Sequence, residues 1–435
     1  MAVRVLHEGI LAMALVTLPF VGGLGGGVAV AATTSAAPQT ERRLGAGGDE
    51  VRIVCFGDSI TGIYYHTGGL RAWPELLELA LRQEYPKAAL KVFNAGISGN
   101  ATPAALARLQ KDVLDRQPHL VVAMFGMNDL AYGPADAAKD AAQKAAYRAH
   151  LEQLISRIRS GGAEVILMTP NSVYPEAAPT RPPERLAEFA GSMREVGAAL
   201  TVPVVDAFAE YERLRRTDLR QWREMMSETI HPSQPGHRVF AELVAGAICG
   251  RPVVLQGLVA SQPCLGHTAA ALKAGGPLTI VVAETLQEEV CGALRAAAPG
   301  IEITPIVWPV AGQSLAQIET WAKGIRQQAK RVLVVGSFSP ESVLCGASEE
   351  AFVRQAAWVA CYALAFGRRE WDVVFVAPLA APGGLTPEQR AGAALVQGMV
   401  EAHDLVWIEP PGADPAARRA GLRDWLQREL KASAP

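Results

Sequence analysis

The stretch of sequence that decides the fold lies at residues 52–60 and reads RIVCFGDSI. The run at its start, RIVCF, is rich in β-branched and aromatic side chains, which is typical of a buried strand. The turn residues Gly57 and Asp58 follow, and residues 73–84 then place apolar side chains at helical spacing. Because a strand followed by a helix is the repeating unit of a parallel sheet, this stretch predicts an α/β fold.

The same alternation continues over residues 50–249, which we predict to be one domain. Strands are predicted at residues 52–56, 91–94, 120–125, 164–168 and 203–205. An Ala-rich stretch at residues 134–159 predicts a long helix before the fourth strand. Five parallel strands with helical crossovers predict a doubly wound domain, whose ligands gather at the carboxyl ends of the strands.

The pattern starts again after Cys249 and predicts a second α/β domain over residues 277–435. Its strands are predicted at residues 278–283, 302–308, 331–335, 372–377 and 404–408. The segment VILMTP at 165–170 parallels VVFVAP at 373–378, which favours an internal duplication. The alternative is two unrelated domains, because any two parallel α/β domains space their strands similarly.

The N-terminal residues 1–31 predict a secretory signal peptide. Arg4 precedes an apolar run at 10–20, and small residues at 28–32 suit cleavage after Ala31. An uncleaved anchor is the alternative, and the glycines in this region disfavour it. After cleavage we expect no stable membrane span, and a secreted or periplasmic protein. Composition predicts a flexible linker over residues 32–49 and an inter-domain linker over residues 250–276.

Charge and cysteine content exclude several other classes of protein. The 435 residues carry 41 basic and 43 acidic side chains, a net charge of −2 without any basic block, so no nucleic-acid partner is expected. The six cysteines form no CxxC pair and the eight histidines no HExxH motif, so we expect no metal site. Cys249 and Cys264 flank the junction, either as a disulfide or as free thiols.

Polar residues follow the predicted strands of the first domain, at the edge where ligands gather. Ser59 follows the first strand, Gly99 lies in the loop after the second, and Asn128 follows the third. Glu228 and His231 lie near the end of the domain. Each alone is an ordinary turn or loop residue. Together they supply a hydroxyl, a base, a carboxylate and N–H donors, the set that acyl transfer requires.

These blocks resemble those of the SGNH (GDSL-type) esterase family over about residues 51–248. The matching segments are Gly57-Asp58-Ser59, Gly99, Gly126-x-Asn128-Asp129 and x-x-His231-Pro232. The resemblance implies a flavodoxin-like three-layer α/β/α domain with a five-stranded parallel sheet and no cofactor. It also implies that Ser59 is the nucleophile and His231 the general base. The oxyanion hole would be formed by the backbone N–H groups of Ser59 and Gly99 and the side-chain amide of Asn128.

One residue departs from the family pattern. The family usually has Asp three residues before the histidine, and this chain has Glu228. A carboxylate one methylene longer can still orient the imidazole of His231, but it must approach from a different position. The third catalytic role of Glu228 is therefore a hypothesis.

The second domain lacks the reactive residues at the matching positions. Ala283-Glu284-Thr285 stands where the first domain has Gly57-Asp58-Ser59, and Gly336-Ser337-Phe338 stands where it has Gly126-Met127-Asn128. No His-Pro block follows the last predicted strand. We therefore expect a degenerate, non-catalytic copy, whose role the fold alone does not define.

The predicted function is that of a secreted serine esterase that hydrolyses a small acyl ester, with acetylated carbohydrate as the expected substrate. The segment YYHTGGLRAWP at residues 64–74 has aromatic and polar side chains that suit a sugar better than a fatty chain. A lysophospholipase or thioesterase is one alternative. A carbohydrate-binding or cell-surface protein whose catalytic domain has decayed is the other.

Overall fold

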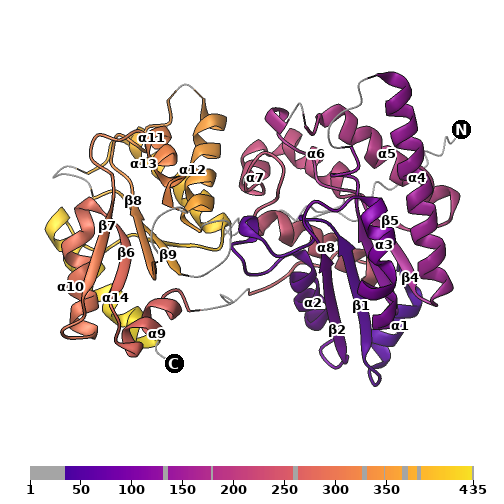
Figure 1. The fold of residues 1–435 in the computed structure, drawn as a ribbon, viewed down its shortest axis with the longest axis horizontal. Helices are drawn as coiled ribbons and strands as arrows, with labels where there is room; N and C mark the ends of the chain where they lie inside the picture. Colours follow the sequence, from indigo (N-terminus) through magenta and orange to yellow (C-terminus); the bar gives the residue numbers. More distant parts are fainter. Residues whose placement is uncertain are drawn as a thin grey trace, which may run out of the picture.

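The computed structural model describes residues 35–130, 136–177, 180–257, 263–325, 331–346, 348–364, 371–379 and 384–433. Two α/β units lie side by side, each built on a five-stranded parallel sheet (Figure 1). The predicted fold class is confirmed. The predicted signal peptide at residues 1–31 lies outside the described residues. Within the described ranges, no helix is long and apolar enough to cross a membrane.

The sheet of the first unit has the strand order β2-β1-β3-β4-β5, with every pair parallel. Its strands are β1 (Val51–Gly57), β2 (Leu90–Gly96), β3 (Leu120–Met124), β4 (Glu164–Met168) and β5 (Val204–Val205). Each strand predicted for this half is present, with small shifts at the ends. The central strand β1 is almost wholly buried because both of its faces are covered by helices.

Helices cover both faces of this sheet and produce three layers. One face packs against α1 (Pro38–Ala46), α2 (Trp73–Glu84) and α8 (Gln234–Cys249), and the other against α3 (Thr102–Asp112), α4 (Ala137–Ser160) and α5 (Pro183–Ala199). Two further helices, α6 (Ala207–Thr217) and α7 (Leu219–Glu224), follow β5. Helix α2 begins at the predicted residue, where the Glu75 carboxylate accepts a hydrogen bond from the N–H of Ala72 (3.0 Å).

The second unit repeats this arrangement. Its strands are β6 (Leu278–Ala283), β7 (Ile303–Trp308), β8 (Leu333–Ser337), β9 (Asp372–Val376) and β10 (Val406–Ile408). The order β7-β6-β8-β9-β10 is that of the first sheet, strand for strand. One face carries α9 (Gly266–Ala274), α10 (Gln287–Ala297) and α14 (Pro415–Ala432), and the other α11 (Leu315–Ala322), α12 (Glu349–Ala363) and α13 (Pro387–Ala402).

Both predicted linkers are wrong in part, because each contains a helix. Residues 38–46 of the first form α1, and residues 266–274 of the second form α9. Glu164, the first residue of β4, accepts hydrogen bonds from two N–H groups in the first turn of α1 (3.0 and 2.7 Å). Asp372, the first residue of β9, does the same for α9 (3.2 and 2.7 Å). A carboxylate at a helix N-terminus stabilises the helix, and neither partner is close in sequence, so composition alone did not predict them.

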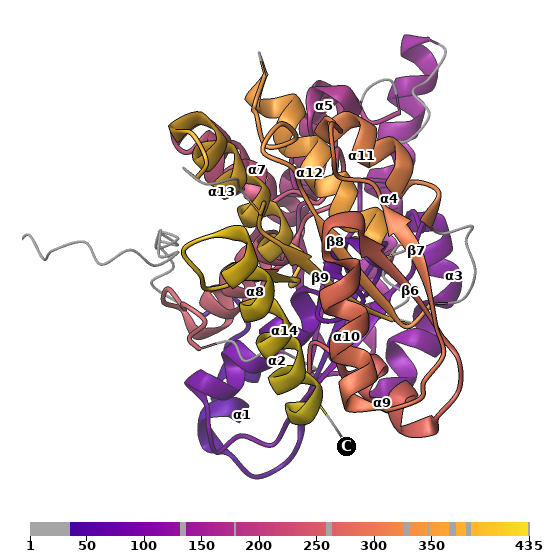
Figure 2. The same cartoon turned by 90° about the vertical axis from the view of Figure 1, so that its left-hand side faces the viewer.

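The two units meet where α7 contacts α13, and these helices lie next to each other in Figure 2. Each unit has its own cluster of buried apolar side chains. The six cysteines, Cys249 and Cys264 among them, are free thiols in this structure. The units are therefore joined by surface packing and by the chain itself, and no disulfide between described residues links them.

Candidate active site

The candidate nucleophile Ser59 lies in a tight turn directly after β1. The turn is closed by hydrogen bonds from the N–H groups of Thr61 and Gly62 to the carbonyl of Asp58 (3.2 and 3.1 Å). A Cβ on Gly57 would lie 2.0 Å from the Thr61 hydroxyl and 2.9 Å from the carbonyl of Met124, so only glycine fits there. Ser59 is largely buried, with 8% of its surface exposed, and lies at the carboxyl edge of the sheet, where ligands of such sheets gather.

His231 lies beside this serine, although the two are far apart in sequence. Ser59 Oγ and His231 Nε2 are 2.9 Å apart. The opposite ring nitrogen, Nδ1, faces the carboxylate of Glu228. Since a carboxylate accepts, Nδ1 carries a proton, and in the neutral form of the ring Nε2 is the acceptor for the serine hydroxyl. The structure thus brings together a hydroxyl and a base in the arrangement that removes a proton from serine.

The side chain of Glu228 folds back toward the backbone and the ring of His231. One carboxylate oxygen, Oε1, accepts from both the ring and the backbone N–H of His231, the latter at 2.6 Å. Glu228 is buried, and burial alone would raise its pKa. The charge of His231 and the hydrogen bonds from its ring and backbone outweigh burial and hold the pKa of Glu228 below its usual value. The carboxylate is therefore charged where it meets the imidazole.

The structure brings the predicted oxyanion-hole residues to the same edge, but Asn128 has other partners there. Its amide Nδ2 donates to Asp58 Oδ2 and to the carbonyl of Asn100, each at 3.1 Å. Gly99 has φ +76° in the turn after β2, and the space beside its Cα is open. Both amide hydrogens of Asn128 already have acceptors, so its role toward an oxyanion stays a prediction, as do those of Gly99 and the Ser59 N–H.

Asp58 and Arg181 complete the surroundings of Asn128. Asp58 Oδ1 accepts from the N–H of Ile60 at 2.9 Å, which ties down the turn as expected. Burial raises the pKa of Asp58 to about 6, although the Ile60 N–H and the charges of His231 and Arg181 lower it in part. The Arg181 guanidinium donates to Asn128 Oδ1 at 2.8 Å. Arg181 has no counterpart in the sequence motifs, and no signal in a surface-loop arginine could have identified it.

Two further histidines pack behind His231 and were not assigned this role from sequence. The ring of His66 stacks on that of His231, with centroids 4.5 Å apart and planes within 16°. His66 also stacks on His237 at 5.6 Å, and His237 Nδ1 accepts from the N–H of Trp73 (3.2 Å). Burial lowers the pKa of His66 well below its usual value and that of His237 to about 3, so both rings are neutral supports.

This packing corrects one expectation about residues 64–74. We expect the aromatic and polar side chains of this segment to suit a sugar, but His66, Thr67 and Trp73 are fully buried. Tyr64 is partly exposed, and its hydroxyl accepts from the N–H of Ser98 at 2.9 Å. The segment therefore mainly supports the catalytic loop from below, and its apolar and aromatic content reflects core packing.

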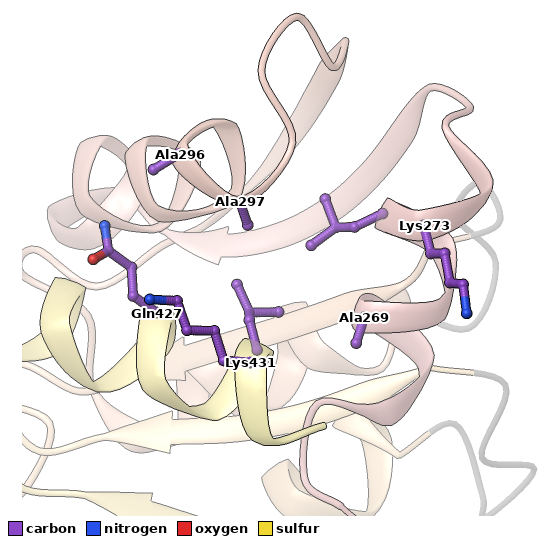
Figure 3. Close-up of a pocket in the computed structure, with 8 residues that line it drawn as sticks. Ala269, Lys273, Ala296, Ala297, Gln427 and Lys431 are labelled. Atoms are coloured by element: carbon purple, nitrogen blue, oxygen red, sulfur yellow. The ribbon is translucent and has the colours of Figure 1, made fainter. Parts of the chain in front are cut away.

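A cavity of about 530 Å³ in the second unit is unconnected with this chemistry (Figure 3). It lies between α9, α10 and α14, on one face of the second sheet. Small apolar and long polar side chains line it: Ala269, Leu272, Lys273, Ala296, Ala297, Gln427, Leu430 and Lys431. None of the candidate catalytic residues is among them, and the lining contains no carboxylate or imidazole that could act as an acid or base.

Comparison with known proteins places these residues in a family context. The model of the GDSL-like lipase/acylhydrolase family matches residues 55–239. Among curated proteins, the uncharacterized lipoprotein YqeF of Bacillus subtilis is 36% identical over 27% of this chain, and the match spans 47% of that protein, about half its length. An acetylxylan esterase of Geobacillus stearothermophilus is 27% identical over 37% of this chain and 73% of its own length.

Solved structures with similarity to the chain match about half of it. A lipase/acylhydrolase from Enterococcus faecalis is 32% identical, with a TM-score of 0.38, and is matched over its full length by 48% of this chain. The acetylxylan esterase Axe2 from Geobacillus stearothermophilus is 23% identical, with a TM-score of 0.39, over 47% of this chain and 96% of its own. The family match contains Ser59, Gly99, Asn128, Glu228 and His231.

Proposed function

We propose that the protein is an exported serine esterase that removes acetyl groups from carbohydrate. The domain at residues 55–239 belongs to the GDSL-like lipase/acylhydrolase family, a family of carboxylic ester hydrolases. The observation that carries the proposal is the continuous chain from Ser59 Oγ through the ring of His231 to Glu228, with 2.9 Å between the hydroxyl and Nε2. A protein that only binds carbohydrate needs no such arrangement.

In the proposed reaction, Ser59 Oγ attacks the ester carbonyl as its proton passes to His231 Nε2. The imidazolium that forms is stabilised by Glu228, which remains ionised because its pKa is held low. His231 then returns the proton to the departing alcohol oxygen, and the acyl group stays on Ser59. A water molecule repeats the sequence, with His231 again as base, and releases the acid.

Charge develops on the carbonyl oxygen in both steps and needs donors that are already in place. The backbone N–H groups of Ser59 and Gly99 lie at the carboxyl edge of the sheet, where we assign them this role. The amide of Asn128 joins them if it exchanges its hydrogen bond to Asp58 for one to the oxyanion. Arg181 holds the other end of that amide, so it keeps the group oriented during this exchange.

The acetyl-carbohydrate assignment is supported by the similarity to an acetylxylan esterase and by the polar groups of Tyr64 and Arg181 near the serine. Export is supported by the signal-peptide pattern and by the relative named as a lipoprotein. A second candidate, hydrolysis of longer acyl esters, is favoured by Ile63 and Ile97, which are 40% and 42% exposed in the loops after β1 and β2. Exposed apolar side chains near the nucleophile would suit a longer acyl chain.

Turnover of p-nitrophenyl esters from acetate to palmitate, together with acetate release from acetylated xylan and other acetylated glycans, tests both candidates. The Ser59→Ala variant provides the background rate. We expect acetate to be the preferred acyl group and at least one acetylated glycan to release acetate. Preference for octanoate or longer would replace the first candidate by the second. Absence of turnover on the whole series would overturn the esterase assignment.

A further inference from the structure

The second unit contacts the first at the segment that carries Glu228 and His231. This segment, residues 225–233, is a tight turn closed by the Ser227 N–H to the His231 carbonyl (2.9 Å) and by an antiparallel bridge between Met226 and Pro232. The side chain of His231 faces Ser59, and that of Glu228 faces His231. The side chain of Ser227, the residue just before Glu228, contacts the second unit instead.

Ser227 meets two buried side chains of the second unit, Cys361 in α12 and His403 at the end of α13. Its hydroxyl lies 3.1 Å from His403 Nε2 and 3.2 Å from Cys361 Sγ, and those two atoms are 3.3 Å apart. All three residues are fully buried. A closed triangle of hydroxyl, thiol and imidazole between two domains is an unusual use of polar groups, because burying them costs free energy unless each is hydrogen-bonded.

The protons of this triangle can be assigned. His403 Nδ1 lies 2.7 Å from the carbonyl of Met399, so Nδ1 carries the hydrogen and Nε2 of the neutral ring accepts. The Ser227 hydroxyl therefore donates to His403. Burial, which lowers the pKa of His403 to about 4, keeps the ring in this neutral form at pH 7.

Cys361 supplies the remaining hydrogen. Burial first, and then the nearby charge of Glu228, raise the pKa of its thiol to about 12, so the thiol stays protonated and donates toward Ser227. The effect of Glu228 on this thiol also indicates that the catalytic carboxylate lies close to the second unit. Every polar atom of the triangle thus has a partner, and Ser227 is held by both of its neighbours.

A second set of contacts joins the second unit to α7, the helix directly before this turn. Arg223, in α7, forms an ion pair with Glu349 of α12 at 2.7 Å. Gly398 of α13 packs so closely on α7 that an added Cβ would lie 3.3 Å from a carboxylate oxygen of Glu224. The second unit therefore contacts both the helix and the turn that lead to Glu228.

We propose that Cys361 and His403 are positioning residues for the esterase, through which the second unit fixes Ser227 and holds Glu228 against His231. The proposal rests on the proposed function. It gives the second unit a role in the reaction although that unit has no catalytic residues of its own at the matching positions. The second unit acts as a clamp on the catalytic turn, without contact with substrate.

The test uses the full-length chain and the variants Ser227→Ala, His403→Leu and Cys361→Ser. We expect Ser227→Ala and His403→Leu to lower kcat by roughly ten- to a hundredfold with little change in KM, the loss that a small misplacement of catalytic groups produces. Cys361→Ser keeps a donor at the same place, so it should retain most of the activity. Cys291→Ala is the matched control, because that buried cysteine of α10 is remote from the turn.

A fluorophosphonate probe separates this proposal from the proposed function. Ser59 Oγ attacks phosphorus, fluoride leaves, and the serine proton passes to His231. The labelling rate therefore reports the activation of Ser59, and the measurement does not require knowledge of the natural substrate. Labelling should slow in Ser227→Ala and His403→Leu in parallel with kcat. If the wild type is labelled and these folded variants react at the rate of Cys291→Ala, the clamp is wrong. If the wild type is not labelled at all, the esterase and the clamp are both wrong.

Discussion

The two units have the same strand order, and they differ in what lies at the carboxyl edge of each sheet. After β1 and β3 the first unit presents Ser59 and Asn128, both with hydrogen-bonding groups at this edge. After β8 the second unit has Phe338, a fully buried ring that stacks on Phe375 with centroids 5.6 Å apart. Aromatic packing thus fills a position that the first unit uses for a polar amide.

The position of Asp58 differs in the same way. Glu284, which follows β6, is exposed and accepts hydrogen bonds from the N–H groups of Val310 (2.9 Å) and Ala311 in the loop after β7. Its carboxylate joins two loops, and its hydrogen-bond partners among the described residues include no nucleophile or imidazole. The sheet topology thus provides an edge where ligands can bind, and a few side chains at that edge determine whether a reactive site can form there.

The likeness of the units extends to details that a shared topology does not require. Glu164 and Asp372 are both the first residue of the fourth strand, and each receives the second and third residues of the helix that precedes its sheet. The helices on each face also follow in the same order. These correspondences support our proposal of an internal duplication, after which the second copy lost its catalytic residues.

The largest effect is expected when the candidate nucleophile is removed from the first unit, and the matching residue of the second unit provides the comparison. Ser59→Ala and His231→Ala should each lower kcat/KM on an acetyl ester by on the order of a thousandfold or more, since the two act on the same proton. Thr285→Ala, the matched change in the second unit, should leave the rate unchanged. A Ser59→Ala variant that keeps a tenth of the activity would exclude Ser59 as the nucleophile.

The next largest effect is expected for Glu228→Gln. An amide at this position either loses the hydrogen bond to His231 Nδ1 or supports the wrong tautomer, so kcat/KM should fall by about a hundredfold or more. Glu284→Gln in the second unit should change kcat/KM by less than twofold. A similarly small change for Glu228→Gln would mean that Ser59 and His231 work as a pair without the carboxylate.

Buried histidines in both units predict a loss of stability in acid. The pKa of His237 is lowered to about 3 and that of His403 to about 4, from an ordinary 6.5. Below pH 6.5 the unfolded chain therefore binds protons that the folded chain does not, and stability falls as pH falls until the folded pKa is reached. At pH 5 each histidine should cost about 2 kcal/mol relative to pH 7.5.

Asp58 acts in the opposite direction, because its folded pKa of about 6 lies above its ordinary value of 3.8. The folded chain therefore binds an extra proton on Asp58 between these pH values. This proton increases the stability of the folded chain as the pH falls through 6. Urea unfolding from pH 5 to 7.5, followed by tryptophan fluorescence, measures the sum. A free energy of unfolding that is flat or rises toward pH 5 would contradict the burial of the two histidines.

The sequence was sufficient to predict the fold and to select candidate residues for the reaction, because both depend on local patterns. Strands such as β4 and β6 were predicted to the residue, since short apolar runs between turn residues leave few alternatives. Ser59, Asn128 and His231 were identified because their motifs follow strand ends or begin a helix. The proximity of Ser59 to His231 then followed from the topology of a parallel sheet.

What the sequence did not predict depends on partners far along the chain. Helices α1 and α9 are stabilised by carboxylates on strands that are distant in sequence. Their own composition is typical of a linker and therefore did not predict a helix. The stacking of His66 on His231 and the contact of Arg181 with Asn128 arise from packing of loops that carry no periodic pattern. The contact of Ser227 with the second unit likewise has no local signal.

The smallest effect on the rate is expected for Arg181. In the second unit the position that matches Asn128 is Phe338, which has no amide for an arginine to orient. The guanidinium of Arg181 donates to Asn128 Oδ1, so it fixes the plane in which the amide hydrogens lie. Arg181→Ala should lower kcat by about three- to tenfold with a smaller change in KM, the effect of losing one hydrogen bond to a charged group that orients a donor. Arg181→Lys should restore part of the rate, because a cation can still reach the oxygen. Arg194→Ala is the control, since the guanidinium of that arginine pairs with Asp206 (2.6 Å) and not with Asn128. If Arg181→Ala matches this control in kcat, then Asp58 and Asn100 suffice to orient the amide, and the first unit's edge depends on fewer polar contacts than we infer.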